Sequence, residues 1–182
     1  IKSDKFAYDK IKSIVTVSGN VIIIDKTNNT KVTGDNFIYF KNDEIIVSEE
    51  TVNINIDENY FVETNKIEYL IKEKIIKSDL ETSMKDSEGN SFSVSKFKFT
   101  VFDKIFNGEN LIFLDKNNNE YIFKNAIVQL SNKQILGKDF NLNFDKKTFG
   151  NENQDPRLKG KSVTVNDDLT IVKKGVFTTC KK

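Results

Sequence analysis

Few residues of this chain have the type and spacing that catalysis requires. The sequence contains no histidine, which excludes Ser-His-Asp and Cys-His nucleophiles and the usual general base near neutral pH. Its one cysteine, Cys180, has no second cysteine in the sequence to pair with. The acidic residues are spread along turns and strand faces, without the convergent pair that glycoside hydrolysis needs. We therefore expect no enzymatic activity.

The stretch 115–119 begins like a calcium-binding loop. Such a loop needs a glycine at its sixth position and a bidentate glutamate at its twelfth. This sequence has Glu120 and Ala126 at those positions. We therefore interpret residues 115–119 as a turn, and we expect neither a metal ion nor another cofactor.

The composition favours a folded chain rich in β-structure. The 182 residues are 37% hydrophobic and 11% aromatic, yet no apolar run approaches the roughly 20 residues of a membrane-spanning helix. Two alanines and one proline stand beside 22 asparagines, and this mixture disfavours helices and suits strands joined by turns. The 28 basic and 27 acidic residues nearly cancel, so the charge indicates no nucleic-acid partner.

An internal repeat is the strongest signal in the sequence. Five segments align, at 17–25, 47–54, 76–84, 106–115 and 136–145. With Gly19, Glu49, Ser78, Gly108 and Gly137 taken as equivalent, the successive spacings are 30, 29, 30 and 29 residues. Each unit reads as a strand, a polar turn that begins with Asp, a second strand and a second polar turn.

Alternation within the strands predicts which side chains are buried. Residues 52–56 read Val-Asn-Ile-Asn-Ile and residues 140–144 read Phe-Asn-Leu-Asn-Phe, so their apolar positions share one face. Carrying this register through the repeat predicts one apolar interior to which every unit contributes. Its expected members are Ile22, Ile24, Phe37, Tyr39, Val52, Ile54, Ile56, Ile67, Tyr69, Met84, Phe97, Phe99, Val128, Phe140, Leu142 and Phe144.

Five two-strand units predict an all-β fold, an elongated, open antiparallel β-jelly roll whose inner faces form one interior. A right-handed parallel β-helix is the alternative, although the polar turns fit hairpin connections better than helix corners. We expect a single domain over residues 1–182. It would have a leader at 1–10, an insertion in the last hairpin at 146–160 and a junction at 175–182.

The repeated unit resembles the OstA repeat of the lipopolysaccharide transport proteins LptA, LptC and the amino-terminal domain of LptD. The likeness rests on the pattern Val-x-Gly-Asn-Val-x-Ile-x-Asp at 17–25, and it extends over residues 6–180. Two further stretches, Asp-Pro-Arg-Leu-Lys-Gly at 155–160 and Gly-Val-Phe-Thr-Thr-Cys at 175–180, are similar to the region where the periplasmic domain of LptD leads into its outer-membrane barrel. The LptD amino-terminal domain is therefore the favoured member of the family.

The resemblance implies an apolar groove that holds the acyl chains of lipopolysaccharide, so the expected interior residues become lipid-groove candidates. It implies LptA as a partner, joined at the amino-terminal edge by β-augmentation. It also implies LptE and the LptD barrel at the other end, a location at the periplasmic face of the Gram-negative outer membrane, and a disulfide from Cys180 to a segment beyond this sequence.

Two other interpretations stay open. A periplasmic bridge protein like LptA or LptC would have the same fold and lipid but no barrel. A structural or adhesive β-repeat protein would use the same inward residues only as a dry core, which is the ordinary role of such residues in a β-sandwich.

Overall fold

The computed structural model describes residues 1–149, 154–166 and 169–180, most of which lie in β-strands. A short 3-10 helix, η1, covers Lys146–Phe149. The strands are β1 (Lys5–Asp9), β2 (Ile14–Asp25), β3 (Thr30–Phe40), β4 (Ile45–Ser48), β5 (Val52–Ile56), β6 (Tyr60–Thr64), β7 (Ile67–Leu70), β8 (Ile75–Ser78), β9 (Thr82–Asp86), β10 (Ser91–Val94), β11 (Lys96–Thr100), β12 (Ile105–Leu114), β13 (Glu120–Gln129), β14 (Gln134–Asn143), β15 (Arg157–Val165), β16 (Thr170–Lys173) and β17 (Val176–Thr178).

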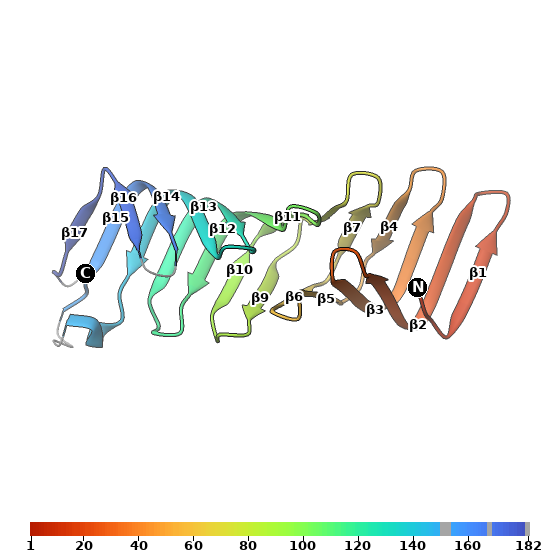
Figure 1. Cartoon of the computed structure of the whole chain (residues 1–182), viewed down its shortest axis with the longest axis horizontal. Coiled ribbons are helices and arrows are strands. Elements are labelled where there is room, and N and C mark those ends of the chain that lie inside the picture. Colours follow the sequence, from red (N-terminus) through yellow and green to blue (C-terminus); the bar gives the residue numbers. More distant parts are fainter. Residues whose placement is uncertain (150–153, 167–168, 181–182) are drawn as a thin grey trace.

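The chain runs as one antiparallel zigzag along the long axis of the molecule, with the two termini toward opposite ends (Figure 1). All pairs between the described strands are antiparallel. This excludes the parallel β-helix and confirms the all-β antiparallel jelly roll. Along the chain most hairpin turns alternate between the top and the lower part of the view, as the polar turns of the repeat predict (Figure 1).

Each long pass of the zigzag crosses two half-sheets. β2, β3 and β12 to β15 run through both half-sheets without interruption, whereas the passes β4–β5, β6–β7, β8–β9 and β10–β11 are interrupted midway. We call the half-sheet with β1, β4, β7, β8, β11 and β16 the upper half-sheet, and the one with β5, β6, β9, β10 and β17 the lower half-sheet (Figure 1). The inner faces of the two half-sheets enclose the hydrophobic core.

The repeated positions of the sequence lie where the passes bend. Gly19 and Asn20 have φ of 75° and 48°, and the register between β2 and β3 shifts there. Asn110 and Asp139 also have positive φ, of 51° and 50°. In the second unit, Glu49 lies in the break between β4 and β5. The period of about 30 residues therefore marks the crossings from one half-sheet to the other.

The predicted inward orientation of Ile22 and Ile24 is wrong. Val21 is buried and Ile23 packs against the core, whereas Ile24 is 52% exposed. Two consecutive left-handed residues, Gly19 and Asn20, shift the alternation within this unit. The register carried over from the second unit is therefore displaced by one residue, which moves every side chain to the opposite face.

The two ends of the chain contain strands where flanking segments were expected. β1 lies within the expected leader at 1–10, and residues 157–160 of the expected insertion form the start of β15. The connection from β14 to β15 contains η1, and Phe144 donates its N–H to the carbonyl of Pro156. Residues 150–153 of the insertion, and 181–182 of the junction, lie outside the described residues.

Candidate functional site

The interior between the half-sheets collects fourteen of the sixteen predicted residues. Eleven are buried: Phe37, Val52, Ile54, Ile56, Ile67, Met84, Phe97, Phe99, Val128, Phe140 and Leu142. Three are partly buried and pack against this core: Tyr39, Tyr69 and Phe144. The candidates therefore form one continuous apolar region rather than several separate pockets.

Several interior residues were missed by the sequence reasoning. They include Val17, Ile46, Val62, Ile76, Phe92, Phe106, Leu111, Phe113 and Phe123, all buried. The signal that could have found them is the same alternation, since β6 and β10 also show buried residues at every second position. These strands complete the inner faces between the segments that were predicted.

The interior changes its chemistry along the molecule. Among buried hydrophobic residues, ten of thirteen between 14 and 86 are Val or Ile, whereas seven of fifteen between 91 and 144 are Phe. We call these regions the aliphatic half and the aromatic half. In the aromatic half the rings pack in pairs, with centroids 4.6 Å apart for Phe92 and Phe113 and 5.0 Å apart for Phe97 and Phe106.

Glycines make room for neighbouring side chains at the bend of the aromatic half. A Cβ atom on Gly137 would lie 2.1 Å from Cδ1 of Phe123, and one on Gly108 would lie 2.8 Å from Cγ1 of Val94. Such distances are too short for real carbon contacts. These two glycines are therefore required by the close approach of neighbouring side chains.

Hydroxyl groups occupy the corresponding place in the aliphatic half. Oγ1 of Thr82 donates to Oγ1 of Thr64 at 2.9 Å, and Oγ of Ser78 lies 3.1 Å from the same Thr64 oxygen. Oγ of Ser78 also accepts the backbone N–H of Leu80, in the break between β8 and β9. Buried hydroxyls thus satisfy one another and part of the backbone where the strands are interrupted.

The lower turns form one rim of the interior. In three of them an Asp begins the turn and its carboxylate accepts backbone N–H bonds and an Asn side-chain amide, with Nδ2–Oδ2 distances of 2.6–2.8 Å. The pairs are Asp25–Asn28, Asp86–Asn90 and Asp115–Asn119. Successive turns are also joined, since Asp57 N–H donates to the Asn29 carbonyl and Ser87 N–H to the Asn59 carbonyl. The lower rim is therefore a hydrogen-bonded ladder of turns.

The upper turns form the opposite rim and share a different backbone feature, a residue with positive φ. The five upper turns between β1 and β14 each end in a residue with φ of 53–56°, namely Ser13, Glu44, Lys74, Lys104 and Lys133. The carbonyls of the first four accept the N–H of Lys41, Ile71, Val101 and Leu130 at 2.9–3.1 Å, each from the start of the next upper turn. The upper rim is therefore also held from turn to turn.

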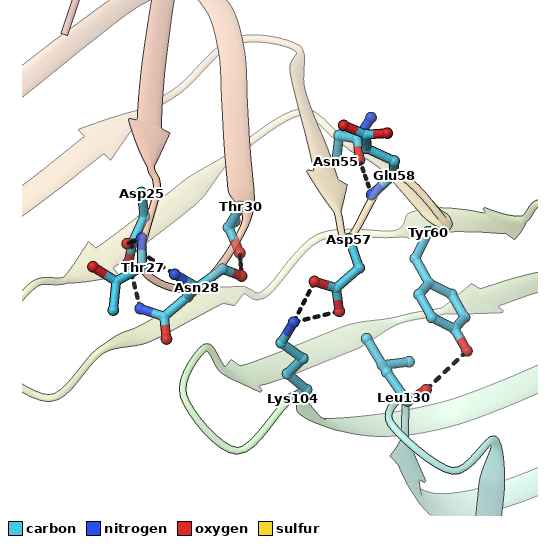
Figure 2. A network of polar contacts seen from close by, with 10 residues as sticks. All are labelled: Asp25, Thr27, Asn28, Thr30, Asn55, Asp57, Glu58, Tyr60, Lys104 and Leu130. Carbon is cyan, nitrogen blue, oxygen red and sulfur yellow. Dashed lines mark hydrogen bonds and ion pairs between the residues drawn. The ribbon is translucent and has the colours of Figure 1, made fainter.

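Polar contacts between the two rims close the mouth of the interior. Lys104 of the upper rim reaches both carboxylate oxygens of Asp57 on the lower rim, and the hydroxyl of Tyr60 donates to the carbonyl of Leu130 at 3.1 Å (Figure 2). One turn further along, Lys133 pairs with Glu88. The mouth is closed by these side chains and not by continuous backbone pairing.

Asp25 and Tyr121, both along the mouth, have displaced pKa values. Burial raises the pKa of Asp25, but hydrogen bonds from Asn28 and Thr27 and the charge of Lys74 outweigh burial and hold it below its ordinary value. Burial and the nearby Asp115 carboxylate raise the pKa of Tyr121 to about 12. Asp25 is therefore negative and Tyr121 neutral over the whole range near neutral pH.

A hollow of about 1100 Å³ lies on the outer face of the upper half-sheet. Its lining includes Lys77, Lys98, Ile127 and Leu136, which alternate with core residues along their strands. Lys77 forms an ion pair with Glu68 at 2.8 Å in this hollow. The lining of this hollow therefore mixes charged and apolar side chains.

The metal, membrane and disulfide expectations can be compared with the part of the chain that the structure describes. Among these residues no group of three or more His, Cys, Asp or Glu side chains could hold a metal ion, and residues 115–119 form a turn. The same residues include no helix of the length and apolarity needed to cross a membrane. Cys180 is exposed and its thiol is free, so the disulfide implied by the resemblance stays a prediction.

Comparison with known proteins reveals a likeness in structure. No family model matches the chain, and no curated protein sequence does. The crystal structure of LptH, the LptA-homologous periplasmic component of the lipopolysaccharide transport device from Pseudomonas aeruginosa, matches with a TM-score of 0.50. The match covers 59% of this chain and 79% of LptH at 18% sequence identity. The protein therefore has the LptA-like antiparallel β-jelly-roll fold.

Proposed function

We propose that this protein is a periplasmic bridge for lipopolysaccharide, which it carries with the acyl chains held between the two half-sheets. The observation that carries the proposal is the continuity of the apolar interior, which runs from Val17 in the first unit to Val163 near the carboxyl end. The LptA-like fold supports the proposal. Transport of this kind requires shielding of apolar chains from water and no chemical reaction.

The interior has to open to receive a lipid. Its side chains pack against one another, so an acyl chain must part the half-sheets and replace part of these contacts. Burial of the chain compensates for this loss, at about 0.8 kcal/mol for each methylene removed from water. The route of entry that breaks the fewest backbone hydrogen bonds is the mouth between the rims, where side-chain contacts bridge the half-sheets.

Both ends of the molecule are suited to joining similar domains. β1 pairs with β2 on one side, and all five of its residues are exposed. At the other end β16 and β17 pair with β15 and present Ile171, Val176 and Phe177 at 50–68% exposure. Edge strands with free N–H and C=O groups favour β-augmentation by a second jelly roll. We propose an LptA-type domain as the partner of the β1 edge.

A finer version of the proposal is that the chain is the amino-terminal domain of an LptD protein, at the periplasmic face of the outer membrane. Support comes from the resemblance at 155–160 and 175–180, with LptE and the barrel as further partners. In that protein Cys180 would be disulfide-bonded to a distant segment. Mass spectrometry of the native, non-reduced protein tests this, because a free Cys180 thiol would contradict it.

Photo-crosslinking tests the proposed function with matched positions. A photoreactive phenylalanine analogue replaces Phe37 or Phe140, both 1% exposed in the interior, or Phe61, which is 49% exposed on the outer face. After incubation with purified lipopolysaccharide and illumination, we expect a lipid adduct from Phe37 and Phe140 and almost none from Phe61. Adducts from neither interior position would overturn the proposal and favour the dry-core structural protein.

A further inference from the structure

The upper rim carries lysines at a repeated position that faces carboxylates on the lower rim. We propose that these lysines are a binding row for the phosphate groups of an acylated lipid, which the lower-rim carboxylates occupy while the interior is empty. This inference rests on the proposed function, because it concerns the mouth through which the acyl chains would enter.

The lysines recur with the period of the fold. Lys74, Lys104 and Lys133 are the last residues of three successive upper turns, with φ of 53–54° and spacings of 30 and 29 residues. Glycine would adopt this left-handed conformation more readily, yet lysine stands at all three positions. The repetition places three ammonium groups in a row along one rim.

Two of the three lysines form an ion pair with a carboxylate from a distant part of the sequence, and the ammonium of Lys74 lies 5.8 Å from the centroid of the Phe102 ring. Lys104 pairs with Asp57 and Lys133 pairs with Glu88. These pairs span 47 and 45 residues, so each lower turn faces the upper turn about one and a half units further along the chain. The contacts therefore join the two rims across the mouth and do not join neighbours on one rim (Figure 2).

Each of these ion pairs can break and its lysine can bind another anion without a change in the backbone of the turns. Backbone hydrogen bonds from neighbouring turns hold Lys104 and Asp57, since the Lys104 carbonyl accepts from Leu130 and the Asp57 N–H donates to Asn29. Their side chains remain 23% and 30% exposed, and those of Lys133 and Glu88 remain 45% and 42% exposed. Ion pairs with this much access to water contribute little individually, so a competing anion can displace the carboxylate.

Phosphate is the headgroup chemistry that fits this row. A lysine ammonium is a flexible point charge with three donors, which suits phosphate oxygens. Directly behind the row lies the apolar interior, where Tyr60 is buried and Val101 is fully enclosed next to the upper turn. A lipid with acyl chains in the interior would therefore present its phosphates at the level of the rim lysines.

The test compares variants that lose the same ion pairs from opposite sides. The lysine variant carries Lys104→Gln and Lys133→Gln, and the carboxylate variant carries Asp57→Asn and Glu88→Gln. Lys77→Gln is the matched control, because Lys77 also forms an ion pair, with Glu68, but on the outer face. Affinity is measured from the adduct yield at Phe140 against the concentration of lipopolysaccharide, either intact or with its phosphates removed.

We expect the carboxylate variant to bind intact lipopolysaccharide about threefold to tenfold more tightly than the parent protein, and the lysine variant to bind it more weakly by a similar factor. The two variants should bind the dephosphorylated lipid with the same affinity. A general effect on stability cannot produce opposite shifts, because both variants remove the same pairs. Lys77→Gln should match the parent protein with both lipids.

The inference is overturned if the parent protein gives adducts at Phe140 while both variants shift in the same direction, or neither shifts, with intact lipopolysaccharide. That result would leave the proposed function standing. Absence of any adduct at Phe140 in the parent protein would instead remove the proposed function, and the binding row with it.

Discussion

The aliphatic and the aromatic halves build the same bend from different residues. In the aliphatic half the passes from β4 to β9 are interrupted midway, and the inner side of their bend carries Ser48, Thr64 and Ser78. In the aromatic half it carries Gly108, Ala126 and Gly137, and β12, β13 and β14 continue unbroken. The two glycines of the aromatic half are required by the close approach of neighbouring side chains.

At the bend of the aromatic half the Phe123 ring fills the space beside Gly137, and Val94 and Leu111 fill the space beside Gly108. In the aliphatic half the hydroxyl of Ser78 instead accepts the backbone N–H of Leu80, where the strand pairing stops. Different kinds of substitution should therefore destabilise the two halves. The aromatic half should be sensitive to volume, and the aliphatic half to loss of hydrogen bonds.

The largest expected effect is the loss of a ring from the aromatic half. Phe123→Ala should lower the free energy of unfolding by about 3–5 kcal/mol, because this fully buried ring packs against Phe140 with centroids 5.4 Å apart. Urea unfolding followed by circular dichroism measures the change. Lys124→Ala, at the next and exposed position, should stay within about 0.5 kcal/mol. A similar loss for both variants would show that the interior is not closely packed.

The second-largest expected effect is that of added side-chain volume at the bend of the aromatic half. Gly137→Ala should cost about 1–3 kcal/mol, because its new methyl group meets the Phe123 ring. Combining it with Phe123→Leu should recover part of that loss, and the double-mutant cycle in urea measures the coupling. If the changes in the free energy of unfolding from the two substitutions are simply additive, the Phe123 ring is not what requires a glycine at position 137.

Removing a buried hydroxyl should have a smaller effect, in the aliphatic half. Thr82→Val keeps the shape of the side chain but deletes the bonds to Thr64 Oγ1 and to the Leu80 carbonyl, at a cost of about 1 kcal/mol. In the Thr82→Val background, Thr64→Val should lower the free energy of unfolding by less than it does alone, because both partners of the hydrogen bond are then apolar. Equal and additive costs in thermal unfolding would contradict a connected network.

The smallest effect concerns the pH dependence of the lower rim. The pKa of Asp25 is lowered in the folded state, so its contribution to stability is present above the unfolded pKa near 4 and is lost as the pH falls through the lower, folded value. Asp25→Asn should therefore reduce stability at pH 7, by less than about 1 kcal/mol, and flatten its fall between pH 5 and 2. An unchanged acid profile would contradict the role given to the Asn28 and Thr27 hydrogen bonds.

Most of the fold could be predicted because the repeat consists of patterns over short stretches of the sequence. The Asp-initiated turns and alternating strands identify the antiparallel hairpins, and the inward positions of Val52, Ile54, Phe140 and Leu142 follow directly. Ile22 and Ile24 were misplaced because two left-handed residues shift the alternation, and no spacing in the sequence signals that shift.

The mouth could not be predicted, because its contacts join turns that are 45 or 47 residues apart. Their pairing depends on how far the two half-sheets are displaced relative to each other, and this displacement arises from sheet twist. The lysines at 74, 104 and 133 stand at regular spacing in the sequence. Their carboxylate partners can be assigned only when both rims are placed in space.

The central claim is that the packed interior opens at the mouth to take acyl chains. Spin labels on Glu58→Cys and Asp103→Cys, in a Cys180→Ser background, place one probe on each rim beside the Asp57–Lys104 pair. Pulsed dipolar spectroscopy then gives the distance between the rims without and with saturating lipopolysaccharide. We predict a short, narrow distribution in the empty protein that moves to longer distances by several ångströms when lipid binds. An unchanged distribution with lipid bound would contradict the claim.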